Sequence, residues 1–136
     1  MTYALSLPLQ EAVYQHLATD PALAAQLGDA IYDALPAGSL PQTYVTLGPE
    51  QAQDRSDRSG GGARHLIDLT IHSDIAGFAG AKAIAATICD ILLAADLQLS
   101  RGRVVGLWFN RALAKRTTSG GRRITLRFVV RLEDTA

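Results

Sequence analysis

The chain has 136 residues, of which 48% are hydrophobic, and its formal net charge is zero. This length fits a single domain spanning residues 1–136, with one modest core. No apolar run approaches the roughly 20 residues of a membrane-spanning helix, and the N-terminus lacks the positive segment of a signal peptide. We therefore expect no contact with a membrane and synthesis in the cytoplasm.

The zero net charge conceals two oppositely charged halves. Residues 1–50 contain five acidic residues and no Lys or Arg, whereas residues 101–131 contain nine basic residues and no acid. Such an asymmetry indicates a surface that meets a partner of opposite charge: nucleic acid, another protein or a second copy of the chain. The alternative is a solvated strand face whose charges happen to share a sign.

Two helices are predicted near the N-terminus. An apolar stripe with i, i+4, i+8 spacing is formed by Leu9, Val13 and Leu17. It predicts a helix that is capped by Ser6 and ends near Thr19. A short second helix, residues 21–27, follows, with Asp20 as its N-cap and Gly28 at its end.

An extended region follows these helices. Residues 31–32 begin a short extended piece, and residues 33–42 are a loop, since they contain two prolines and a glycine. Residues 43–47 then alternate between the two faces of a strand. Gly48 and Pro49 are expected to end this strand.

A polar segment separates this strand from the next. Residues 50–63 contain three consecutive glycines and no large apolar residue. Such a segment cannot bury enough surface to offset the entropy of ordering it, so we expect a mobile loop that orders only against a neighbour. Alternation returns over residues 64–72, which predicts a second strand.

Residues 78–96 form the segment whose helical pattern is strongest. Its apolar stripe consists of Ile84, Ile88, Ile91, Leu92 and Ala95. The stripe predicts an amphipathic helix, and its many alanines allow a sheet to approach closely. Ser73 or Asp74 is the expected N-cap.

The C-terminal region is predicted to be a long hairpin with its turn at residues 117–121. The side chains expected to face the core in its first arm are Val105, Leu107, Phe109 and Leu113, with Trp108 on the other face. Those expected to face the core in its second arm are Ile124, Leu126, Phe128, Val130 and Leu132. Both arms exceed the usual strand length of about five or six residues, so the hairpin should project beyond the helices.

These elements together predict an α+β fold. We expect an antiparallel sheet of about four strands with a long C-terminal hairpin. The central helix packs on one face of this sheet, with the N-terminal helices beside it.

The sequence contains no pattern typical of a catalytic or metal-binding site. His16, His65 and His72 lack metal-ligand spacing, and Cys89 lies inside a predicted helix. The glycine clusters lack the Lys-Ser or Lys-Thr of a phosphate-binding loop. We therefore predict no catalytic residue, no metal site, no cofactor and no enzymatic activity.

A binding module is the alternative to a purely structural protein. The arginines of the hairpin, together with Trp108 on the outer face, could serve a small basic-faced module for nucleic acid or another protein. Single-strand binders, however, combine a basic groove with several stacking aromatic residues. This chain contains few aromatic residues, so specific readout of a nucleic acid sequence is not expected.

Three segments together resemble a known family: LPLQEAVYQHLATDPALAAQLGDAIYDALP, RHLIDLTIHSDIAGFAGAKAIAATICDILLAAD and the ending RRITLRFVVRLED. The chain resembles, over nearly its whole length, the tail terminators of long-tailed phages and gene transfer agents. These are also called tail completion or head–tail joining proteins. The resemblance lies in the order and composition of the elements.

The resemblance implies a virion structural protein that forms a ring, with six copies as the expected number. Such a ring caps the tail tube, ends tail polymerisation and presents its other surface to the head connector, a stopper or adaptor protein. DNA would pass through the lumen without specific recognition. The protein would be made in the bacterial cytoplasm and would lie at the head–tail junction of a phage, a defective prophage or a gene transfer agent.

The sequence also provides candidate contact residues. Arg55 and Arg58, in the predicted loop, are candidates for contact along the tube axis. Candidates on the hairpin for contact between subunits are Trp108, Arg111, Arg123, Arg127 and Arg131. We expect the last three arginines to meet acids in the N-terminal half of a neighbour. Replacing Arg127 by Glu is expected to block the ring and leave the fold intact.

Overall fold

The computed structural model describes residues 2–56 and 61–135. Its elements, in order, are α1 (Ser6–Ala18), α2 (Pro21–Leu27), β1 (Ile31–Tyr32), β2 (Thr43–Asp54), β3 (Gly62–Ser73), α3 (Ala79–Leu93), β4 (Arg103–Arg116) and β5 (Arg122–Glu133). The fold is α+β, as predicted from the sequence. The sheet has five strands because the short piece at residues 31–32 pairs with β2.

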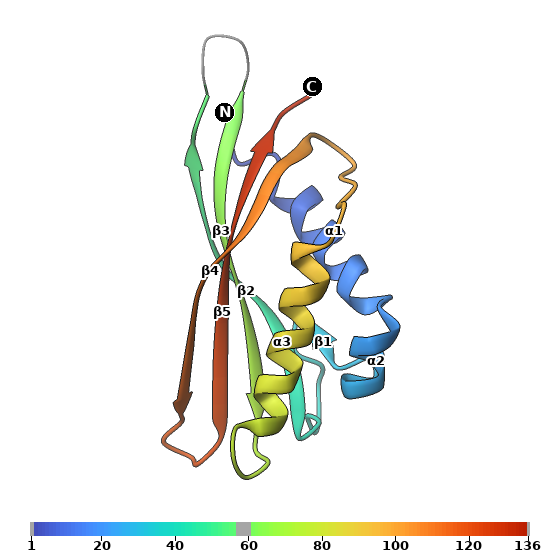
Figure 1. Ribbon diagram of the computed structural model, residues 1–136, viewed down its shortest axis with the longest axis vertical. Coiled ribbons are helices and arrows are strands. Elements are labelled where there is room, and N and C mark those ends of the chain that lie inside the picture. The colour runs from blue at the N-terminus through green and yellow to red at the C-terminus, as the bar shows by residue number, and fades with distance from the viewer. Residues whose placement is uncertain (1, 57–60, 136) are drawn as a thin grey trace.

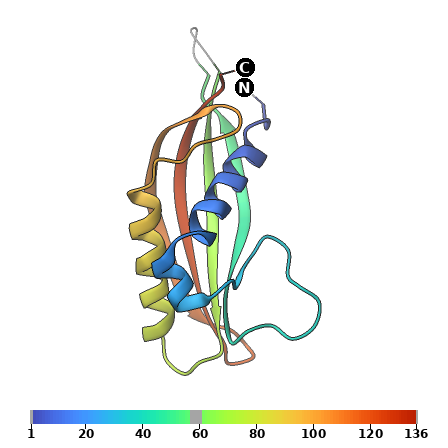
Figure 2. The ribbon, with the colours of Figure 1, turned by 90° about the vertical axis from the view of Figure 1, so that its right-hand side faces the viewer.

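The sheet order is β1-β2-β3-β5-β4, and every pair is antiparallel except β1 with β2. The three helices lie together on one face of the sheet (Figures 1 and 2). The side chains on the opposite face, which we call the outer face, point away from them. The molecule therefore has two layers, with its core between the helices and the inner face.

The core is built from the stripes that the sequence predicts. Its helical contribution comes from Leu9, Val13, Leu17, Leu23, Ile84, Ile88 and Leu92. Its strand contribution comes mainly from Leu69, Ile71 and the five predicted inward positions of β5. Burying large apolar side chains of this kind contributes roughly 1.5 to 3 kcal/mol each.

No helix in the described part of the chain is long and apolar enough to cross a membrane.

The helix boundaries test the predicted caps. Asp20 caps α2 as predicted, since its Oδ1 accepts the backbone N–H groups of Ala22 at 2.9 Å and Leu23 at 3.1 Å. The predicted cap of α1 is wrong, because Ser6 is the first residue of this helix and no side chain caps it. The predicted cap of α3 is also wrong. This helix begins after Phe78 without a side-chain cap, and Ser73 is the last residue of β3 instead.

The predicted loop at residues 50–63 is wrong at both of its ends. Residues 50–54 continue β2, and Gly62 begins β3. The register of the β2–β3 pair shifts between Leu47 and Glu50. Gly48 and Pro49 thus interrupt the pairing, which resumes at Glu50. A bulge of this kind lets a strand continue beyond a proline. Residues 57–60, including Arg58, lie outside the described residues.

The predicted phase of β4 is also wrong in part. Its register with β5 shifts between Val104 and Gly106 and again between Phe109 and Arg111. Each shift inserts a residue that reverses the alternation of faces. As a result, Leu113 pairs with Thr125 on the outer face and Val105 is exposed. Of the expected core positions in this strand, Leu107 packs against the core and Phe109 is 45% exposed.

Candidate assembly surface

The outer face of the sheet gathers most of the predicted contact residues. Antiparallel pairing arranges its side chains in rows across β2, β3, β5 and β4. Each row below is given in the strand order β2, β3, β5, β4, and the rows follow one another toward the β4–β5 turn. The first two rows are Gln53, Arg64, Arg131 and Gly106, then Gln51, Leu66, Val129 and Trp108. The next three are Asp68, Arg127 and Arg111, without a β2 residue, then Thr46, Thr70, Thr125 and Leu113, and finally Tyr44, His72, Arg123 and Lys115. The sheet thus brings residues from both halves of the chain onto one basic surface.

Arg127 is held within its own subunit. Its Nε donates to Oδ1 of Asp68 at 2.9 Å, and its Nη2 donates to Oδ2 at 3.2 Å. Hydrogen bonding to Asp68, together with the charge of that carboxylate, raises the pKa of Arg127. The Asp68 side chain is almost buried, so this two-point contact supplies its hydrogen bonds and its counter-charge. Replacement of Arg127 by Glu would therefore disturb the subunit itself, contrary to the expectation of an intact fold.

The other predicted arginines of the hairpin are available for contact. Among the described residues, Arg111, Arg123 and Arg131 form no ion pair with a carboxylate. The Nε of Arg123 is buried and has no hydrogen-bond partner. Burial, followed by the nearby charge of Arg123, lowers the pKa of His72 in the same row. These arginines present positive charge that the subunit does not neutralise.

Trp108 supplies the large apolar contact on this face. It is 51% exposed, and it pairs with Val129 in the row that also contains Leu66. Its indole lies against the backbone of Gly106, where an added Cβ would be 2.7 Å from Cη2. A glycine is therefore needed at position 106 for the ring to rest on the sheet.

Arg55, a predicted contact residue of the polar segment, lies at the end of the sheet away from the β4–β5 turn. Arg55 follows β2 and is exposed, and its Nη1 donates to the carbonyl oxygen of Asp54 at 3.0 Å. It is separated along the strands from the arginines near the β4–β5 turn. The structure therefore places Arg55 near the end that holds Arg131 and far from Arg123, and Arg58 is outside the described residues.

A polar cluster around Glu50 was missed by sequence reasoning. This carboxylate accepts hydrogen bonds from Ser6 Oγ at 2.6 Å and from the hydroxyl of Tyr3, and it lies 2.8 Å from Nδ1 of the buried His65. Burial alone would raise the pKa of Glu50, but these hydrogen bonds outweigh burial and hold the pKa below its ordinary value. The cluster fixes the segment before α1 to β2 and β3.

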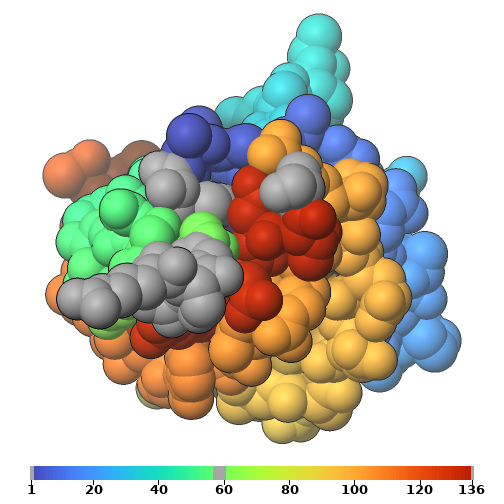
Figure 3. All heavy atoms as spheres, turned by 90° about the horizontal axis from the view of Figure 1, so that it is seen from above, coloured from blue at the N-terminus to red at the C-terminus, as the bar shows by residue number. Residues whose placement is uncertain are grey.

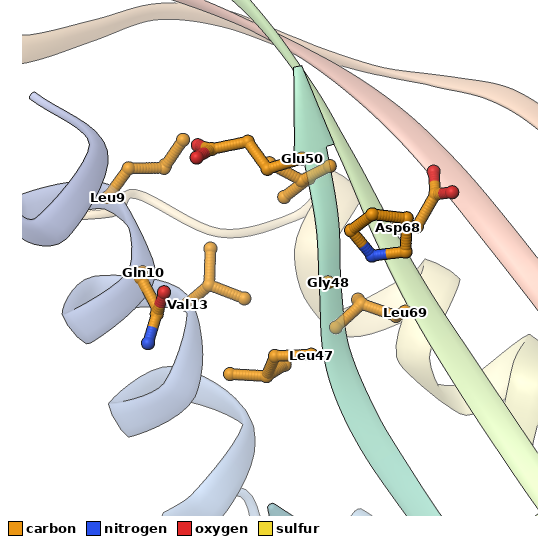
Figure 4. Close-up of a pocket in the computed structure, with 10 residues that line it drawn as sticks. Leu9, Gln10, Val13, Leu47, Gly48, Glu50, Asp68 and Leu69 are labelled. Carbon is orange, nitrogen blue, oxygen red and sulfur yellow. The ribbon is translucent and has the colours of Figure 1, made fainter. Parts of the chain in front are cut away.

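A small hollow lies between α1 and β2. It has a volume of about 50 Å³ and is lined by Leu9, Val13 and Leu47 among others. Figure 4 shows the carboxylates of Glu50 and Asp68 directed away from each other. Each carboxylate is already bound, one within the polar cluster and the other by Arg127. The hollow thus offers little space and no facing pair of carboxylates for acid–base chemistry.

The described residues form a two-layer α+β protein with a polar and basic outer face and an exposed edge strand. Residues 11–133 match the family described as tail completion protein gp17. The chain therefore belongs to this family of tail structural proteins, in agreement with the resemblance in its sequence.

A solved structure supports this assignment. The chain is similar to a protein chain in the virion of a native gene transfer agent (GTA) particle, with 53% sequence identity and a TM-score of 0.92. The similarity covers 97% of this chain and 99% of that chain. A comparison with curated proteins gave no match.

Proposed function

We propose that six copies of this chain form a ring that caps the tail tube, ends tail polymerisation and joins the tail to the head connector. The observation that carries this proposal is the tail completion family match over residues 11–133. The similarity along nearly the whole chain to a component of a gene transfer agent virion supports a place in such a particle. The same similarity favours a gene transfer agent or a related phage as its source.

The architecture is compatible with a closed ring. A head-to-tail ring requires two different complementary surfaces on each subunit. The sheet ends at β1 on one side and at β4 on the other, and these edges differ in length, charge and exposed side chains. Arg111, Arg123 and Arg131 add charge that a partner could neutralise.

The proposal assigns the two ends of the ring to different partners. One end would contact the tail tube protein and the other the head connector, while DNA passes through the lumen without specific recognition. We place synthesis in the bacterial cytoplasm and the finished ring at the head–tail junction. A structural role of this kind requires no catalytic activity.

Deletion of the gene tests this function. Without a cap, tube subunits should continue to add to an open end, and heads should remain unattached. Electron microscopy of the lysate should therefore show overlong or headless tails, and a plasmid copy of the gene should restore normal particles. Tails of normal length attached to full heads in the deletion lysate would contradict both termination and joining.

A basic-faced binding module is the second candidate function. The exposed Trp108, in a face that also presents Arg111 and Arg131, is the observation that favours it. Light scattering with and without DNA separates the two functions. Rings that form without DNA favour the tail cap, whereas a monomer that binds DNA and is released by salt favours the module.

A further inference from the structure

Residues 33–42, which we call the arm, pack little against the rest of their own subunit. All ten residues are exposed, including Leu35 at 54% and Leu40 at 38%. Figures 2 and 3 show the arm, in cyan, standing away from the body. Its base is nevertheless fixed, because the N–H of Asp74 donates to the carbonyl oxygen of Gln42 and β1 pairs with β2.

The strand at the opposite edge of the sheet also exposes apolar side chains. β4 pairs only with β5 among the described strands, so its other edge is open. Its exposed large apolar residues are Val105, Trp108, Phe109 and Leu113. Natural proteins rarely leave a long edge strand apolar on both faces unless it is used for assembly.

The arm and residues 109–116 of β4 lie at the same level along the sheet. Strand pairing connects Thr43, at the base of the arm, through Ser73 and Arg122 to Arg116. The same pairing connects Thr46, beside Tyr32 at the other base of the arm, to Leu113. Two copies placed side by side with parallel long axes would therefore bring the arm of one level with residues 109–116 of the other.

The charges of these two regions are complementary. Residues 29–42 contain Asp29 and Asp33 and no Lys or Arg. Residues 109–116 contain Arg111, Lys115 and Arg116 and no acid. Pairing β4 with β4 of another copy would oppose like charges, whereas pairing the arm with β4 opposes unlike charges.

We infer that the arm of one copy docks on residues 109–116 of β4 in the next copy, with Leu35 and Leu40 covering the exposed side of Leu113 and its neighbours. This inference rests on the proposed ring and assigns its repeated contact. The contact is heterologous, since two different surfaces meet, and it can therefore repeat around a ring.

Two variants test the contact in the full-length protein. The arm variant is Leu35→Asp with Leu40→Asp, and the strand variant is Leu113→Asp. The matched control is Leu7→Asp with Leu93→Asp, because both leucines are exposed on helices outside the two regions. Circular dichroism should show the wild-type fold in all three, since each replaced side chain is exposed.

Light scattering then measures assembly under conditions in which the wild type forms rings. The control should assemble like the wild type, and the arm and strand variants should each remain at the subunit mass of 14.5 kDa. In a mixture of the two variants, the strand variant supplies an intact arm and the arm variant supplies an intact β4. It should therefore form a one-to-one pair of twice the subunit mass and nothing larger.

The outcomes distinguish this contact from the ring as such. If the wild type assembles and both variants assemble equally well, the contact is overturned while the ring stands. If both variants are monomeric and their mixture is also monomeric, a heterologous contact of these surfaces is overturned. If the wild type itself never assembles, the self-contact is overturned, and the deletion lysate still tests the tail-capping function.

Discussion

The role of Arg127 becomes clear only from its neighbours in the folded sheet. Its alternating position in the strand placed it correctly on a polar face. Its partner, Asp68, is 59 residues away in the sequence, so only the register of β3 with β5 identifies the pair. The ion pair makes this arginine a structural residue of the subunit, whereas Arg131 in the same strand has no such partner among the described residues.

Replacing Arg127 by Gln should therefore destabilise the subunit. The change would leave the nearly buried carboxylate of Asp68 without its cation, which is costly for a buried charge. We expect a lower urea midpoint than in the wild type, measured by circular dichroism. Arg131→Gln is the matched control and should leave the midpoint nearly unchanged; equal midpoints for both variants would contradict a stabilising role for the pair.

The Glu50 cluster predicts how stability depends on pH. The pKa of Glu50 is lowered by folding, so its carboxylate stabilises the folded state above the ordinary value of 4.5, and this contribution is lost as the pH falls through the folded pKa. Urea unfolding below pH 4.5 should show a falling free energy of unfolding in the wild type. Glu50→Gln should flatten that fall; an unchanged slope would show that other groups control it.

The contact of Trp108 with Gly106 can be followed by fluorescence, because the chain has one Trp. Gly106→Ala should displace the indole from the sheet and move its emission to longer wavelength, since the added Cβ would meet the ring. Gly80→Ala is the control, because its added Cβ meets nothing within 4 Å. Identical spectra for Gly106→Ala and the wild type would mean that the ring does not rest there.

At the scale of the elements, local patterns predicted the helices better than the strands. The stripe of α3 and the Asp20 cap of α2 depend on neighbouring residues, and both were recognised. The end of β2 was missed because residues 50–54 are polar, and their pairing with β3 outweighs that composition. The phase of β4 was missed because its two bulges depend on pairing with β5.

The cap of α2 provides a quantitative test at this scale. Asp20→Ala should lower the free energy of unfolding by about 1 kcal/mol, because two backbone N–H groups lose their acceptor. Asp29→Ala is a suitable control, since Asp29 is exposed and follows α2. Urea denaturation of the two variants measures the difference, and equal losses would show that the cap contributes nothing specific.

At the scale of the whole molecule, the charge asymmetry of the sequence becomes a spatial one. Many acidic residues of the N-terminal half lie on or beside the helices and the arm, whereas the basic residues of the hairpin lie on β4 and β5. The two edges of the sheet therefore differ in charge as well as in shape. This difference is what a ring of identical subunits requires, because each subunit must offer its neighbours two unlike surfaces.

Electron cryo-microscopy of assembled particles tests the central claim most directly. The proposed function predicts a six-fold ring of this chain between the end of the tail tube and the head connector. The arm of each copy should lie against β4 of the next. Density for this chain elsewhere in the particle, or a junction without a ring of this chain, would contradict the proposed role as the cap that ends the tail and joins it to the head.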